Sequence, residues 1–151
     1  MISWSDFEKI DIRVGTIIEI NDFPKAKNQA YKLTIDFGEL GILRSSAQIT
    51  KLYSKEQILG EQVIAVVNFP PKQIADFMSE CLVLGVVGCD KEVTLLRPER
   101  QVNNGLKIGW KKYNIVNLIY AYSLSPNRNF VNFYKKYHEA FFNHYYINFS
   151  I

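Results

Sequence analysis

The sequence predicts an all-β domain, a small closed barrel of five strands with a short helix and small additional elements. Two observations lead to this prediction. Most of the first 109 residues fall into short β-branched or alternating stretches separated by glycine and other turn residues. A single stretch between them has a helical pattern. The chain has 151 residues, 48% of them hydrophobic, which is enough for one such domain with a packed core.

The expected strands follow from their side-chain patterns. The first, IDIRVGTIIEI, alternates and then becomes apolar, and Gly15 within it predicts a tight bend. The second, YKLTIDFG, places Leu33, Ile35 and Phe37 on one side. Later strands are short, and a double proline follows QVIAVVNF. The expected strands cover residues 10–20, 31–38, 41–46, 62–69, 81–88 and 92–98, with a turn between the last two.

The segment SAQITKLYSKEQILG, residues 46–60, is expected to contain the helix. Ser45 or Ser46 is the expected N-terminal cap, and Gly60 is the expected stop. Short strands with glycine kinks and one helix midway fit a Greek-key barrel of the oligonucleotide/oligosaccharide-binding (OB) type. No internal repeat is visible in the sequence.

Composition argues against several classes of protein. No run of about 18–20 uncharged apolar residues is present, so no membrane span is expected. The opening stretch, MISWSDFEKIDIRVG, lacks the basic and apolar regions of a secretory signal. Cys81 and Cys89 are too few for a disulfide framework, and neither has a CxxC partner or a neighbouring histidine. They indicate reduced thiols in a cytoplasmic protein, with no metal or cofactor expected.

Charge and aromatic content both change after Gly109. Residues 1–109 contain 13 Lys and Arg against 14 Asp and Glu, whereas residues 110–151 contain 5 against 1. The same two segments contain 8 and 13 aromatic residues. Because the excess positive charge lies in the tail, the sequence pI of 8.8 is weak support for a nucleic-acid surface on the main body.

We therefore divide the chain into a domain at 1–109 and an aromatic, Asn-rich extension at 110–151. Phenylalanine and tyrosine recur at spacings of three or four over 130–146, which is compatible with one amphipathic helix. Two interpretations of the extension compete. It is either a basic aromatic arm that packs on a dimer or touches RNA or a membrane surface, or non-native sequence translated past the proper end of the reading frame. The abrupt change at Trp110 favours the second interpretation.

Several motifs of the main body occur in a specific order, namely DIRVGTI, FPKAKNQAYKLTIDFG, ILRSSAQITKLY, VIAVVNFPPKQIADFMSECLVLGVV and LLRPERQVNNGLKIG. In that order and at those spacings they resemble the tRNA-binding-domain family, which has the OB fold. Within that family they most resemble the stand-alone CsaA type of export-related chaperone. SSAQIT and FPPKQI with the following MSE are the most specific parts, and the resemblance covers about residues 6–109.

The resemblance implies a non-enzymatic homodimer that binds unfolded or export-bound polypeptides and serves protein export. The family name implies the alternative, a module that binds tRNA or other RNA. An enzyme is not expected, because the main body has no histidine, no G-x-S-x-G elbow and no phosphate-binding glycine loop. Charge distinguishes the two functions, because phosphate-driven affinity needs several cations on one face and falls with salt, whereas apolar peptide binding persists.

OB barrels bind linear polymers across one sheet face with aromatic side chains and flanking cations. In this chain, the short polar side chains of the SSAQIT motif lie between two cationic residues in the sequence. The FPPKQ motif contains an apolar ring, two prolines that make the loop rigid, and two long polar side chains that can contact a ligand. The candidate residues of a peptide or RNA groove are Arg13, Arg44, Ser45, Ser46, Gln48, Lys51, Phe69, Pro70, Pro71, Lys72, Gln73, Met78 and Glu80.

Several of these candidates have a purely structural alternative. Arg13 is then an edge arginine that pairs with Asp11 or Glu19. The double proline either stiffens a loop beside the groove or simply ends a strand. Met78 either contacts a peptide or belongs to the core, and Glu80 either meets a polar ligand or caps a turn.

Overall fold

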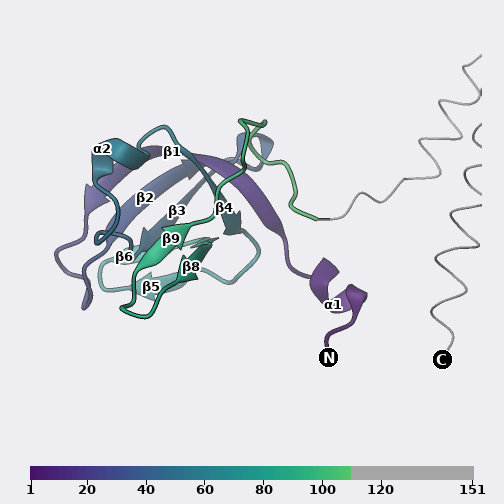
Figure 1. Ribbon diagram of the computed structural model, residues 1–151, viewed down its shortest axis with the longest axis horizontal. Helices are drawn as coiled ribbons and strands as arrows, with labels where there is room; N and C mark the ends of the chain where they lie inside the picture. Colours follow the sequence, from purple (N-terminus) through teal and green to yellow (C-terminus); the bar gives the residue numbers. More distant parts are fainter. Residues whose placement is uncertain (110–151) are drawn as a thin grey trace, which may run out of the picture. The chain divides into compact units, whose positions relative to one another are not determined.

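A computed structural model describes residues 1–109, and its centre is an antiparallel sheet that curls into a nearly closed barrel (Figure 1). The strand order in this sheet is β3-β2-β1-β4-β7. The strands are β1 (Ile12–Asp22), β2 (Tyr31–Asp36), β3 (Ile42–Ala47), β4 (Gln62–Val66) and β7 (Leu82–Val83). The predicted all-β, five-stranded barrel is confirmed.

Small elements complete the described unit. Two antiparallel hairpins lie outside the main sheet, one formed by β5 (Lys72–Ile74) and β6 (Phe77–Ser79), the other by β8 (Gly85–Val87) and β9 (Val93–Leu95). The helical elements are α1 (Trp4–Glu8), the 3-10 turn η1 (Gly38–Leu40) and α2 (Lys55–Ile58).

Backbone and side-chain hydrogen bonds bring the two outer strands of the sheet together. The N–H groups of Glu80 and Cys81 both donate to the carbonyl of Arg44, at 2.7 and 3.3 Å. The hydroxyl of Ser45, which is 1% exposed, donates to the carbonyl of Cys81 at 3.0 Å. These bonds connect β3 to the segment that leads into β7, and the sheet closes there.

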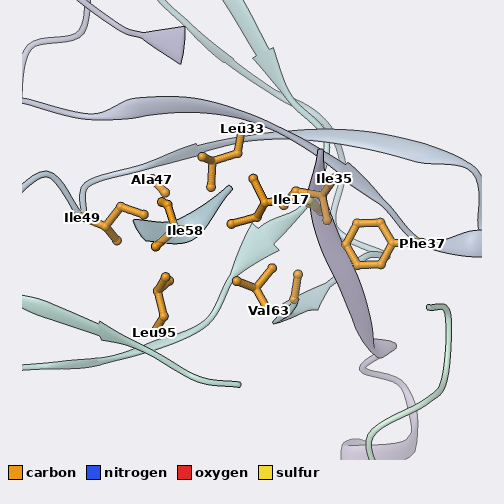
Figure 2. Close-up of a cluster of buried hydrophobic side chains, with 11 residues drawn as sticks. Ile17, Leu33, Ile35, Phe37, Ala47, Ile49, Ile58, Val63 and Leu95 are labelled. Atoms are coloured by element: carbon orange, nitrogen blue, oxygen red, sulfur yellow. The ribbon is translucent and has the colours of Figure 1, made fainter. Parts of the chain in front are cut away.

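The core fills the inside of this barrel (Figure 2). Leu33, Ile35 and Phe37 are fully buried, as the alternation in YKLTIDFG predicts. Opposite them lie Ile17 from β1 and Val63 from β4, and α2 and β9 add further apolar side chains. The core therefore contains side chains from strands at the start of the domain, such as β1 and β2, and near its end, such as β9.

The predicted helix over 46–60 is mostly wrong. Ser45 and Ser46 do not cap it, because both belong to β3, where they pair with Leu33 and Lys32 of β2. The helix is reduced to the single turn α2, and its cap is Ser54 in a reciprocal capping box with Gln57. The alternation of β3 places Ser45 inside the barrel, so strand pairing outweighs the local helical pattern.

The double proline does not end the strand that precedes it. β4 stops at Val66, although the sequence predicted a strand to Phe69. Beyond β4 the chain stays bonded to the N-terminal segment, first through the N–H of Val67, which donates to the carbonyl of Asp11 at 2.9 Å, and then through Asn68. The side chain of Asn68 accepts from the N–H of Asp11 at 2.9 Å and donates to the carbonyl of Lys9 at 2.7 Å. Pro70 and Pro71 instead stand directly before β5.

Gly15 is required for packing, and a tight bend at this position stays a prediction. A Cβ atom at this position would lie 2.7 Å from side-chain atoms of Ile35 and Phe37, so glycine is required by close packing across the barrel. The irregularity of β1 lies further along, where the register with β2 shifts between Ile17 and Glu19.

The last described residues fasten the chain back onto its first strand. We call residues 102–108 the C-terminal strap. The N–H of Val14 donates to the carbonyl of Leu106 at 3.0 Å, and the N–H of Gly105 donates to the carbonyl of Val14 at 2.8 Å. The side chain of Gln62 bonds both backbone groups of Val102, at 2.7 and 3.0 Å. The strap thus links β1 and β4 to the end of the domain.

Replacing Gly105 with alanine is expected to destabilise the domain by more than about 1 kcal/mol. Gly105 has a φ of +82°, and a Cβ atom there would lie 2.6 Å from the carbonyl oxygen of Phe37. Gly41→Ala is the matched control, because its φ is +83° but no described atom lies within 4 Å of its Cβ position. Chemical denaturation gives the loss in free energy of unfolding for each variant. The loss at Gly41 measures the cost of a positive φ alone, and any further loss at Gly105 measures the steric clash. Equal losses would contradict a role for the close contact.

Within residues 1–109, no helix is long and apolar enough to cross a membrane. The same part of the chain contains no cluster of acidic, cysteine or histidine side chains that could hold a metal ion. The predictions for 110–151, a helix over 130–146 and an extension of non-native origin, lie outside the described residues.

Candidate polymer-binding site

The two most specific motifs of the sequence meet in space. The β5–β6 hairpin packs beside β3, and the N–H of Ser46 donates to the hydroxyl of Ser79 at 3.3 Å. Within the hairpin, Lys72 pairs with Ser79 and Gln73 with Met78. We call this region the hairpin site. It comprises Arg44, Ser46, Phe69, Pro70, Pro71, Lys72, Gln73, Met78 and Glu80.

An arginine–glutamate pair fastens the end of the hairpin to β3. Arg44 donates from Nε and Nη2 to the two carboxylate oxygens of Glu80, each at 3.3 Å. The backbone N–H of Arg44 donates to the same carboxylate at 2.9 Å. The hydrogen bonds from Arg44 lower the pKa of Glu80, and the same pairing raises the pKa of Arg44. Both groups are therefore charged at neutral pH, and they neutralise each other.

A small aromatic cluster lies under the hairpin. The ring of Phe77, which is buried, meets the ring of Phe23 edge-on with centroids 5.6 Å apart. The ammonium of Lys32 lies 4.6 Å from the Phe23 centroid and 5.4 Å from the Phe77 centroid. The guanidinium of Arg44 lies 5.7 Å from the Phe77 centroid. Apolar packing and cation–π attraction thus hold β6 against β2 and β3.

Asp76, in the turn of the hairpin, is shared by two lysines. Its carboxylate lies 2.8 Å from Lys25 Nζ and 3.5 Å from Lys32 Nζ. The hydrogen bond from Lys25 is the main cause of the lowered pKa of Asp76, and the same bond raises the pKa of Lys25. Three cations next to the hairpin, Lys25, Lys32 and Arg44, therefore have acidic partners within the protein.

The rim of the site is open to solvent. Phe69 is 52% exposed, and Pro70, Pro71 and Lys72 are exposed after it. Lys72 makes no ion pair with any of residues 1–109. Gln73 donates to the carbonyl of Ala75 at 2.8 Å, which stabilises the hairpin turn.

The predicted residues at the end of β3 extend toward the second hairpin. Gln48 is exposed just beyond the strand. Lys51 donates to the carbonyl of Asp90 in the β8–β9 turn at 2.7 Å. Met78 is half-buried within β6, and Glu80 directly follows that strand.

Two predicted residues lie elsewhere. Ser45 faces the inside of the barrel, where its hydroxyl bonds the carbonyl of Cys81. Arg13 is on β1, and Asp11 accepts from its Nε at 2.7 Å. The Nη1 atom of Arg13 also donates to the carbonyl of Gly105 in the C-terminal strap at 2.9 Å. Arg13 is thus engaged in the internal pairing that the sequence left open as its alternative role.

Sequence reasoning missed the contribution of Lys32 and Asp76. A signal for Lys32 was present, because it occupies a polar place in the alternating YKLTIDF pattern and so faces away from Leu33 and Ile35. Its pairing with Ser46 across β2 and β3 then places it next to the SSAQIT motif. For Asp76 no local signal existed, since its partners are far away in the sequence.

A polar hollow of the described unit is separate from the hairpin site. It has an open volume of about 620 Å³, and Thr16, Glu39, Gln62 and Asn104 are among its lining residues. None of the predicted site residues lines it. Asn104 accepts from the Thr16 hydroxyl at 2.8 Å and from Gln62 Nε2 at 3.1 Å, and its amide donates to Asp36 at 3.0 Å. These side chains are thus used to hold the C-terminal strap.

A family model described as "Putative tRNA binding domain" matches residues 12–107, which is nearly the whole described barrel. This chain belongs to the tRNA-binding domain family. The family predicted from the order of the motifs is thereby confirmed.

Two solved structures, each of a chain that is matched over nearly its whole length, are also similar. The chaperone CsaA of Bacillus anthracis str. Ames is 50% identical, with a TM-score of 0.70, over 72% of this chain and 99% of that one. The CsaA chaperone protein of Picrophilus torridus is 54% identical, with a TM-score of 0.68, over 72% of this chain and all of that one. The predicted resemblance to the CsaA type within the family is therefore confirmed.

Curated relatives of a different size share the same domain. The methionine–tRNA ligase of Thermococcus kodakarensis is 34% identical over 107 residues, which is 71% of this chain but 14% of the ligase. The chain thus spans about one seventh of the length of the curated relatives it matches.

Proposed function

We propose that the chain is a non-enzymatic, homodimeric chaperone of the cytoplasm that binds unfolded or export-bound polypeptides at the hairpin site. The observation that carries this proposal is the charge pairing of the site. Arg44 is paired with Glu80, and Lys25 and Lys32 share the carboxylate of Asp76, so two acidic groups offset most of the charge of three cations, whereas the ring of Phe69 is 52% exposed. A surface of this kind favours apolar chain segments over polyanions.

The rigidity of the rim supports polypeptide binding further. Proline fixes φ, so Pro70 and Pro71 keep the approach to β5 stiff, and Phe77 anchors the hairpin from below. A preformed surface loses little entropy when a flexible chain binds to it. The similarity to two solved CsaA chaperones, over nearly the full length of each, supports the same function.

Two parts of the proposal concern the setting of the protein. Homodimerisation is supported by large apolar side chains that the described unit leaves exposed, among them Leu59, Leu82 and Leu106. A cytoplasmic location is supported by Cys81 and Cys89, which are free thiols. A role in export rests on the resemblance to the CsaA type.

Binding of tRNA is the second candidate function. It is favoured by the family model and by the domain shared with methionine–tRNA ligases. Lys72 adds an exposed cation without an ion pair in the described part of the chain. A phosphate contact by Lys72 alone predicts a weak dependence of affinity on salt, because that dependence scales with the number of phosphates neutralised.

A competition assay with the full chain tests the two functions. A fluorescent, chemically unfolded polypeptide is bound first, and tRNA is then titrated in at low and at moderate salt. We expect polypeptide binding to persist at moderate salt and tRNA to displace it poorly. Sedimentation of the same sample is expected to show a dimer of the 17.5 kDa chain.

The other outcomes are equally informative. Displacement by tRNA at both salt concentrations would identify RNA as a ligand of the same site and favour the second function. Failure to bind any unfolded polypeptide would overturn the chaperone proposal. A monomer in sedimentation would overturn homodimerisation without affecting the binding site.

A further inference from the structure

The outer edge of β8 has backbone groups that point away from its partner strand. The register of the β8–β9 hairpin pairs Gly85 with Leu95, Val86 with Thr94 and Val87 with Val93. Just beyond β8, the N–H of Gly88 donates to the carbonyl of Glu92 at 2.7 Å, and just before it the carbonyl of Leu84 accepts from the N–H of Leu96 at 3.1 Å. The even-numbered residues of this segment are therefore the ones whose backbone groups face β9. In an antiparallel pair the intervening residues direct their N–H and C=O groups outward. Gly85 and Val87 therefore present these groups at the free edge.

No backbone or side-chain group within residues 1–109 bonds the outward N–H and C=O groups of Gly85 and Val87. The bonds of Leu84 to β4 and to Leu96 lie on the same side of the strand as β9, because Leu84 also has an even number. The unpaired edge thus offers two donors and two acceptors at the two-residue spacing of a strand.

The strand edges of β3, β9 and β5 are blocked. On β3, the N–H groups of Arg44 and Ser46 are bonded by the side chains of Glu80 and Ser79. On β9, the N–H of Leu95 donates to the hydroxyl of Tyr53 at 3.1 Å. The edge of β5 is preceded by two prolines and begins with a lysine, which are the residues that proteins use to prevent strand addition.

The side chains around the β8 edge are apolar and accessible. Val86 is 60% exposed and Val87 is 72% exposed, and the segment 85–88 contains no charged residue. The nearest charges in the sequence, Asp90, Lys91 and Glu92, alternate in sign within the turn. The edge therefore suits a partner strand whose side chains are uncharged and apolar.

We propose that the outer edge of β8 accepts an extended, uncharged, apolar segment of a polypeptide as an added β-strand. This inference rests on the proposed polypeptide-binding function and adds a second mode of contact to it. Main-chain hydrogen bonds to Gly85 and Val87 provide affinity without regard to sequence, and Val86 and Val87 select apolar neighbours. Such an edge suits a chaperone, because every unfolded chain carries the same backbone groups.

Val87→Pro in the full-length chain tests the proposal. Proline removes the outward N–H of residue 87, while the bonds to β9 come from Val86 and Gly88 and are retained. Val87→Thr is the matched control, because it keeps both the N–H and the β-branched shape. The probe is a fluorescent peptide of alternating valine and threonine, compared with the same peptide carrying N-methyl groups on alternate residues. We expect Val87→Pro to weaken binding of the unmodified peptide about tenfold, with no change for Val87→Thr.

A second variant, Val87→Lys, keeps the N–H but adds a charge to the edge, and it is expected to weaken binding in the same way. Thermal unfolding establishes that each variant is folded. Wild-type affinity in folded Val87→Pro and Val87→Lys would overturn the edge proposal, as would equal binding of the N-methylated peptide. A change from dimer to monomer in both variants would show instead that a second copy occupies the edge, and would overturn it too.

The chemically unfolded polypeptide distinguishes this inference from the proposed function. If wild type and Val87→Pro bind it equally, the edge proposal fails while the chaperone function stands. If wild type binds neither the unfolded polypeptide nor the peptide, both fail.

Discussion

Replacing Phe37 with alanine is expected to lower the free energy of unfolding by about 3–5 kcal/mol. Phe37 is completely buried, and its ring atoms lie 2.7 Å from the position that a Cβ atom at Gly15 would take. Its truncation removes apolar contacts and leaves a cavity that the rigid barrel cannot easily fill. Urea denaturation monitored by circular dichroism measures the loss.

Leu40→Ala is the matched control for this prediction. Leu40 lies three positions later, in η1, but it is 46% exposed. Its truncation is expected to change stability by no more than about 0.5–1 kcal/mol. Comparable losses at the two positions would mean that Phe37 does not have the central role in the core that its burial indicates.

Replacing Phe77 with alanine is expected to cost about 3 kcal/mol and to release the hairpin from the barrel. The change removes the contact with Phe23 and the ring that Lys32 and Arg44 approach. The β5–β6 hairpin pairs with no strand of the main sheet, so apart from this ring it is held mainly by polar contacts, namely the Ser46–Ser79 hydrogen bond and the ion pairs of Glu80 and Asp76. Hydrogen exchange is expected to accelerate at residues 72–79, and binding of unfolded polypeptide is expected to weaken about tenfold or more.

Phe69→Ala, in the same segment, provides the comparison. Phe69 is exposed and is not part of the aromatic cluster, so its loss is expected to leave stability within about 0.5 kcal/mol. Polypeptide binding is nevertheless expected to weaken, because the ring is the apolar face of the site. Unchanged binding in both variants would contradict the placement of the polypeptide at the hairpin site.

The barrel could be predicted from the sequence because its strands carry local signals. The alternation that buries Leu33, Ile35 and Phe37 is readable over a few residues, and glycines such as Gly60 and Gly88 lie between elements. The order of motifs then indicated the family. In the structure the two most specific motifs of the sequence are neighbours, and the contact between them joins Ser46 to Ser79.

The errors concern features that depend on residues distant in the sequence. The helix over 46–60 was wrong at its start because Ser45 is required inside the barrel by Cys81, 36 residues later. Just beyond the end of β4, Asn68 contacts Lys9 and Asp11, which are 59 and 57 residues earlier in the sequence. In the site, the pairing of Lys25 and Lys32 with the shared carboxylate of Asp76 has the same origin. No local pattern encodes such pairs, because only the folded chain brings them together.

The C-terminal strap has a consequence for the order of events during synthesis. The carbonyl of Ile12 and both backbone groups of Val14 find their partners in Leu106, Gly105 and Ile108. At translation rates of about 5–20 residues per second, the first strand emerges on the order of 5–20 s before those partners exist. During that interval the growing chain has an incomplete barrel with apolar β1 residues uncovered. A nascent molecule of this protein therefore resembles, for several seconds, the unfolded polypeptides that we propose the finished one to bind.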